Sequence, residues 1–109
     1  MIIDFESMGF DKKTEFLGGK GDFYVRSSKD SMNNIMCDYL EPGASIGYHK
    51  HETNSEIIYI IKGSGKVLYD NIEEMVKEGQ CHYCPKGHFH SLINDSGSNL
   101  YFFAVVCEQ

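Results

Sequence analysis

A chain of 109 residues is long enough for one hydrophobic core but not for two, so we expect a single domain over residues 1–109. Its net charge of −6, without a basic cluster, argues against binding to nucleic acid or to an anionic membrane. The acidic N-terminus does not resemble a secretory signal, and no stretch approaches the roughly 20 apolar residues that span a bilayer. These features predict a cytoplasmic protein whose four cysteines are reduced.

The N-terminal segment, residues 1–21, has no clean period and ends in a glycine-rich stretch, so we expect a loosely structured arm. A turn of helix within this arm stays open. From Asp22 onward, short β-rich segments alternate with turn residues every eight to twelve residues or so, which is typical of a sandwich or barrel. The expected strands are residues 22–27, 34–40, 47–51, 55–62, 66–70, 73–78, 80–84, 90–94 and 100–106.

Helix content should be low, because no window after residue 22 sustains a helical apolar stripe. The fold class expected is therefore all-β. Two segments, residues 57–61 and 100–106, are apolar at successive positions, so both faces of these strands need cover. One face can fill the barrel, whereas the other needs a second sheet, the arm or another subunit. A homodimer built on this outer surface is our hypothesis.

Three residues near the middle of the chain are placed to meet one metal ion. On a strand, residues two apart project to the same face about 6.6 Å apart, so His49 and His51 can reach a common point. Glu56 begins the next β segment and can return its carboxylate to the same side across a hairpin. His90 follows the turn at residues 85–87, which can begin a strand running back past this hairpin.

The chain resembles the cupin superfamily, because its residues fill every specified position of both cupin motifs. Motif one, over residues 43–63, is filled by Gly43, His49, His51, Glu56 and Gly63. Motif two, over residues 79–94, is filled by Gly79, Pro85, Gly87, His90 and Asn94. The resemblance implies a conical jelly-roll barrel, with His49, His51, Glu56 and His90 as the metal ligands. The short spacing between the motifs is similar to that of small single-domain cupins, some of which are described as similar to oxalate decarboxylases.

Other polar residues near the motifs have simpler interpretations. His88 could share the face of His90 as an acid/base group in the pocket, but Gly87 interrupts regular geometry, which favours a turn residue. His82 is a core or interface histidine to which we assign no role. Cys81 and Cys84 lie three apart on an expected strand and so point to opposite faces, which favours buried apolar residues over a metal site.

Three imidazoles and one carboxylate suit Mn, Fe, Co, Ni, Zn or Cu as a single divalent ion. Such a site can bind a small oxygen-donor molecule, a carboxylate, an enolate or a sugar-like compound, with Ile58 and Ile60 as apolar pocket walls. Decarboxylase- or dioxygenase-like chemistry would fit, but no lid acid can be identified, so enzymatic activity stays open. The alternatives are a ligand-binding or sensory cupin without turnover and a metal-free dimerisation module.

Overall fold

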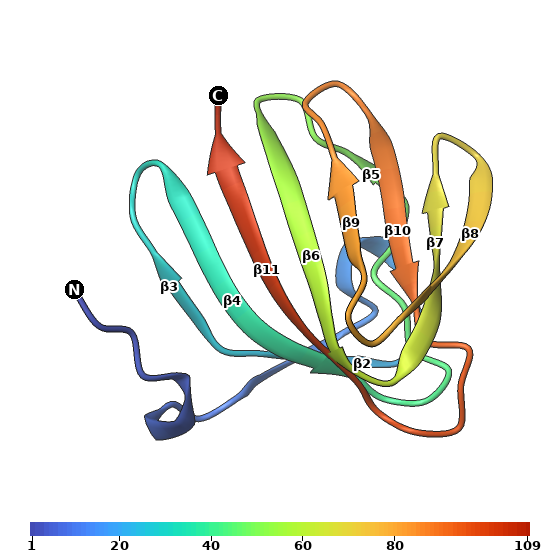
Figure 1. Ribbon diagram of the computed structural model, residues 1–109, viewed down its shortest axis with the longest axis horizontal. Coiled ribbons are helices and arrows are strands. Elements are labelled where there is room, and N and C mark those ends of the chain that lie inside the picture. Colours follow the sequence, from blue (N-terminus) through green and yellow to red (C-terminus); the bar gives the residue numbers. More distant parts are fainter.

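The computed structural model describes residues 1–109 as two antiparallel β-sheets that face each other (Figure 1). One sheet has the strand order β1-β2-β4-β11-β6-β9, with β3 paired to β4, and the other has the order β5-β10-β7-β8. The strands are β1 (Asp11–Thr14), β2 (Asp22–Val25), β3 (Ser27–Lys29), β4 (Asn33–Leu40), β5 (His49–Lys50), β6 (Asn54–Lys62), β7 (Ser64–Tyr69), β8 (Ile72–Lys77), β9 (Cys81–Cys84), β10 (Phe89–Ile93) and β11 (Leu100–Glu108). The prediction of an all-β jelly-roll barrel with little helix is confirmed.

Every strand expected from the sequence is present, but the N-terminal arm is more ordered than expected. It contains two short 3₁₀ turns, η1 (Phe5–Ser7) and η2 (Phe16–Gly18), with β1 between them. β1 pairs antiparallel with β2, from Asp11 opposite Val25 to Thr14 opposite Asp22. The expectation of a loosely structured arm over residues 1–21 is therefore wrong.

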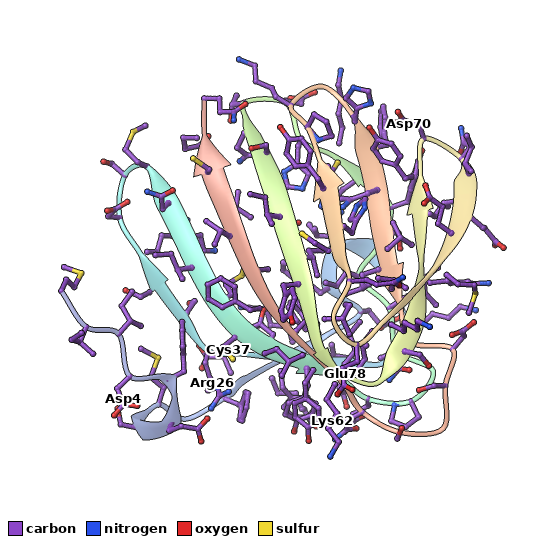
Figure 2. The ribbon with its side chains drawn as sticks, viewed as in Figure 1. Asp4, Arg26, Cys37, Lys62, Asp70 and Glu78 are labelled. Atoms are coloured by element: carbon purple, nitrogen blue, oxygen red, sulfur yellow. The ribbon has the colours of Figure 1, made fainter.

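Arg26 fastens the start of this arm to the larger sheet. Figure 2 shows Arg26 beside Cys37, whose backbone carbonyl accepts a hydrogen bond from the Arg26 Nε at 3.1 Å. The Arg26 Nη1 donates to the carbonyl oxygen of Phe5 at 3.2 Å, and the guanidinium lies 4.3 Å from the centre of the Phe10 ring. One side chain thus joins the arm to strand β4.

The hydrophobic core follows from side-chain alternation on the central strands. β11 lies between β4 and β6, and its inward-facing Leu100, Phe102 and Ala104 are at most 1% exposed. Ile58 and Ile60 of β6 are equally buried, and the ring of Phe23 stacks on Phe102 at 5.9 Å. Complete burial of a leucine, isoleucine or phenylalanine side chain stabilises the fold by about 1.5–3 kcal/mol.

Tight packing closes one end of the barrel. Asn94 is fully buried there, and its Nδ2 donates to the backbone oxygens of Leu40 and Ser98. Gly63 adopts a φ of +98°, and a Cβ at this position would lie 2.8 Å from the carbonyl oxygen of Asn99. Asn94 therefore caps backbone groups at the end where β6 finishes, whereas Glu56 lies near the opposite end of that strand.

The outer face of β6 remains uncovered within one chain. Ile57, Tyr59 and Ile61 are 42–45% exposed, and Tyr83 on the neighbouring strand β9 is 52% exposed. The arm and the second sheet do not cover these residues, so the sequence hypothesis that this face needs another subunit stays a hypothesis. No helix in the structure has the length and apolar character required to cross a membrane.

Candidate metal centre

Three strands and a connecting segment bring the four expected ligand residues together. His49 on β5 and His90 on β10 are direct cross-strand partners, so their side chains share one face of the smaller sheet. His51 follows β5 with one residue between it and His49, and Glu56 lies on β6 of the facing sheet. One donor atom from each of the four residues lies within 4.8 Å of the others.

The donor atoms converge on a common point inside the barrel. The Nε2 atom of His51 is 3.2 Å from that of His49 and 2.9 Å from that of His90, and His49 and His90 are 3.2 Å apart. The Glu56 Oε1 lies 3.2 Å from His51 Nε2 and 3.0 Å from His90 Nε2. His51, Glu56 and His90 are each less than 9% exposed.

Each histidine ring is held from behind through its Nδ1 atom. The partners are the backbone oxygen of Gly47 for His49 at 2.7 Å, Asn54 Oδ1 for His51 at 2.5 Å and His82 Nε2 for His90 at 2.9 Å. Because an oxygen acceptor requires a proton on Nδ1, His49 and His51 take the tautomer whose Nε2 carries a lone pair. Hydrogen bonds of this kind fix both the tautomer and the orientation of metal-binding imidazoles.

This donor set fits a divalent metal ion. Unprotonated Nε2 atoms about 3 Å apart would repel each other, and a cation between them removes that repulsion. For bonds of about 2.1 Å, ligands at right angles are separated by about 3.0 Å, whereas tetrahedral ligands are separated by about 3.4 Å. The observed separations of 2.9–3.2 Å would suit adjacent positions around a six-coordinate ion, and four protein ligands would leave room there for a small oxygen donor.

The electrostatics of the cluster keep a negative charge on Glu56. Burial raises the pKa of this carboxyl, but the imidazoles of His51 and His90, whose Nε2 atoms lie 3.0–3.2 Å from the Glu56 Oε1, outweigh burial and lower the pKa to about 2. Burial lowers the pKa of His49. Burial also lowers the pKa of His51, but its bonds to Glu56 and Asn54 outweigh that effect and raise the pKa.

A cavity of about 590 Å³ opens from His49, His51 and Glu56 toward the larger sheet. Its apolar walls include Phe16 of the N-terminal arm, Phe23, Ile46 and Phe102. The expected pocket residues Ile58 and Ile60 are instead packed in the core and do not line the cavity. They share a face with Glu56 but lie deeper, where Leu100 and Phe102 fill the barrel.

Two polar residues on β4 also line this cavity, and sequence reasoning missed them. Asp38 is 2% exposed, and burial raises the pKa of its carboxyl to about 8, with a smaller contribution from the negative charge of Glu56. Its Oδ1 accepts a hydrogen bond from the backbone N–H of Arg26 at 3.0 Å, whereas its Oδ2 has no partner. The Oδ1 of Asn34 has none either. Polar residues at alternate positions of an apolar strand were the available signal.

His88 lies at the turn before β10 and does not line the cavity. Its Nδ1 contacts the carboxylate of Asp70 at 2.5 Å and lies 3.2 Å from the Tyr69 hydroxyl. Asp70 lies at the turn between β7 and β8, at the upper right of Figure 2. The side chain of His88 is 43% exposed. The structure thus gives it the turn position that the sequence favoured rather than a place in the pocket.

His82, to which the sequence assigned no role, is the residue that contacts His90 from behind. Burial lowers its pKa to about 4, so its imidazole is neutral and can accept the Nδ1 proton of His90. The neighbouring Cys81 and Cys84 differ in burial. Cys84 is buried but Cys81 is exposed, which differs from the expectation that both would be buried.

Comparison with known proteins shows the family. Residues 38–106 match the family model described as the cupin domain, and the chain belongs to this family. An oxalate-binding protein from Thermotoga maritima is 33% identical over an alignment of 113 positions, which covers 97% of this chain and 93% of that protein.

Solved structures agree with this assignment. A crystal structure from T. maritima, described as a "predicted oxalate decarboxylase", superposes with a TM-score of 0.94 at 26% identity over 100% of both chains. The cupin domain of Cnp3 from Schizosaccharomyces pombe gives a TM-score of 0.79 at 12% identity, covering 97% of this chain and 72% of that one. This second similarity shows the fold alone.

Proposed function

We propose that this protein binds one divalent metal ion through His49, His51, Glu56 and His90, and binds a small carboxylate through that ion. The observation that carries the proposal is the convergence of three imidazole Nε2 atoms and one carboxylate oxygen at separations of 2.9–3.2 Å. A relative that covers nearly the whole chain is an oxalate-binding protein, which supports a carboxylate as the ligand.

A bound divalent ion supplies a Lewis acid that attracts and polarises an oxygen donor. The protein supplies the surroundings of that ligand. Phe16, Phe23 and Phe102 give the cavity apolar walls, and a ligand that displaces water from them strengthens electrostatic attraction at the metal centre. Glu56 keeps its charge and reduces the net positive charge of the centre, while Gly47 and Asn54 hold the rings of His49 and His51 in position.

Isothermal titration calorimetry tests the proposal on the metal-free protein with Mn²⁺ or Co²⁺, followed by oxalate. We expect one ion per chain, and oxalate binding only after metal is added. Glu56→Gln and His51→Ala should weaken metal binding at least tenfold or so, because each removes a charge or a ligand. His88→Gln is the matched control and should bind metal like the wild type. Oxalate binding that does not depend on metal would contradict the proposal, and absence of metal binding would leave the metal-free dimerisation module as the explanation.

Turnover is the second candidate function, as a decarboxylase- or dioxygenase-like reaction. It is favoured by the buried Asp38 carboxyl, an acid on the cavity wall that can act on a ligand long enough to reach β4 from the metal centre. Incubation of the metal-loaded protein with small carboxylic acids, monitored by CO₂ release and O₂ consumption, distinguishes this candidate from binding alone. Release of CO₂ that disappears in Glu56→Gln would support an enzyme, and binding without either signal would support a ligand-binding cupin.

We also propose a homodimer formed through the outer face of the larger sheet. The exposed side chains there include Ile57, Tyr59, Ile61 and Tyr83, and no charged residue separates them on β6. Two chains that each carry a charge of −6 repel, so an uncharged face is the surface on which a second copy fits with the smallest electrostatic cost.

A further inference from the structure

The inner face of β4 forms one wall of the metal-centre cavity. Successive residues of a strand point to opposite faces, so Asn34, Met36 and Asp38 project to the same side, and all three line the cavity. Two of these three side chains are polar, in a wall that also includes the apolar Phe23, Phe102 and Val106. A polar pair on a buried strand face is unusual unless something bonds to it.

Both polar side chains have an oxygen atom without a partner. Asp38 is 2% exposed, and only its Oδ1 is bonded, to the backbone N–H of Arg26. Its Oδ2 and the Oδ1 of Asn34 are buried atoms that accept or donate no hydrogen bond within the protein. Since most buried polar atoms in folded proteins are hydrogen-bonded, these two atoms indicate a bond to a molecule in the cavity.

The strand register places this pair at two depths relative to the metal ligands. Asn34 is opposite Val106, which in turn is opposite Glu56, so Asn34 lies two strands from that ligand, about 10 Å along the row. Asp38 is four residues further along β4, about 13 Å deeper in the barrel. All of these residues line one continuous cavity.

The cavity is much larger than a two-carbon dicarboxylate. Its volume of about 590 Å³ would hold some 20 water molecules at about 30 Å³ each. Oxalate has only six non-hydrogen atoms, so with its oxygens at the metal it cannot extend along the roughly 13 Å of β4 that separates Asn34 from Asp38. A molecule that satisfies the polar pair must therefore extend from the metal centre along β4.

We propose that Asn34 and Asp38 select a polyhydroxylated carboxylic acid of about five or six carbons, with its carboxylate at the metal centre and its hydroxyl groups on β4. This inference rests on the proposed function, because it assumes that the ligand is held at the metal by a carboxylate. It goes further by naming the class of ligand and the residues that distinguish it from a simple dicarboxylate.

The hydrogen-bonding chemistry supports hydroxyl groups. The carbonyl oxygen of Asn34 needs a donor, which a carboxylate at neutral pH lacks and a hydroxyl has. Burial raises the pKa of Asp38, so this carboxyl keeps its proton and can donate to a hydroxyl oxygen. A hydroxyl donates and accepts at once, and therefore matches both positions.

The test compares ligands that bind metal equally but differ along the chain. Gluconate and 2-hydroxyhexanoate are six-carbon acids with the same 2-hydroxycarboxylate end, but only gluconate carries further hydroxyl groups. Calorimetry on the Co²⁺-loaded protein should give at least about tenfold tighter binding of gluconate, the value expected for one or two satisfied hydrogen bonds in a buried site. Equal affinities would overturn the inference.

Variants of Asn34 and Asp38 test whether these two residues cause the preference for gluconate. Asp38→Val and Asn34→Val should each weaken gluconate binding about tenfold and leave 2-hydroxyhexanoate unchanged. Asp38→Asn should retain gluconate binding, because its amide still accepts from Arg26 and still donates into the cavity. Ile35→Val, on the opposite face of β4, is the matched control. Gluconate affinity that is unchanged in both valine variants would overturn the assignment.

Oxalate binding and metal content distinguish a failure of this inference from a failure of the proposed function. Oxalate should bind the wild type and all four variants equally, and each variant should hold one Co²⁺ per chain by elemental analysis. If oxalate binds but gluconate has no advantage, this inference fails and the proposed function stands. If no carboxylate binds the loaded protein, the proposed function fails and this inference with it. Should Asp38→Val not fold, Asn34→Val and the ligand pair decide the question.

Discussion

Replacement of His82 by phenylalanine should weaken metal binding without removing a metal ligand. His82 contacts the Nδ1 of His90 at 2.9 Å, and His90 is 2% exposed, so water cannot replace this partner. Loss of such a support typically weakens metal binding about 10- to 100-fold, which corresponds to about 1.4–2.7 kcal/mol. The cost of about 1–3 kcal/mol for an unpaired buried N–H gives the same range. A phenyl ring preserves the edge-to-face packing on Tyr69, where the ring centres are 5.6 Å apart.

The assay is competition for Co²⁺ between the protein and a chelator of known affinity, with His88→Phe as the matched control. His88 lies two residues from His90, but its partner is the partly exposed Asp70, so its replacement should change the metal affinity less than about threefold. Circular dichroism of the metal-free variants should show the wild-type fold. A His82→Phe variant with wild-type metal affinity would refute the reasoning that His82 fixes the ring of His90.

Three further predictions follow from Asp38, the metal ligands and the outer face. Burial raises the pKa of Asp38 to about 8 in the native state, whereas the unfolded chain releases this proton near pH 4. The free energy of unfolding should therefore fall as pH rises between these values, by at most about 1.4 kcal/mol per pH unit. Urea unfolding at pH 5 and 7.5 should show a smaller fall for Asp38→Asn than for the wild type, and equal falls would contradict this prediction. Because ligating imidazoles must be unprotonated, Co²⁺ should dissociate below about pH 6, and retention of the ion well below that pH in a dialysis series would argue against histidine ligands. Ile57→Lys should convert a dimer to a monomer in light scattering, and a wild type that is monomeric at all concentrations would remove the dimer.

The fold was largely predictable because its signals are local. Turn residues separate the strands, and alternation or continuous apolarity marks each strand from β2 onward, except for the short β3. β1 escaped prediction because all of its residues, Asp11–Thr14, are exposed, so it carries no apolar alternation. Its pairing with β2 is a tertiary interaction that the arm's composition does not reveal.

The four residues of the candidate metal centre were predictable as a group for a different reason than the rest of the site. Alternation of His49 and His51, together with the cupin motifs, names all four residues without knowledge of the sheet order. His82 and Asp38 depend on that order. β9 and β10 are consecutive in the chain but lie in different sheets, and only their facing arrangement brings His82 to the ring of His90. Asp38 reaches the cavity because β4 lies two strands from β6, a distant pairing that no local pattern encodes.

The most direct test of the account is a crystal structure of the Co²⁺-loaded protein with anomalous data at the cobalt edge. We predict one anomalous peak within about 2.0–2.3 Å of the Nε2 atoms of His49, His51 and His90 and of the Glu56 Oε1. A peak elsewhere, or no peak at this point in protein saturated with cobalt, would contradict it.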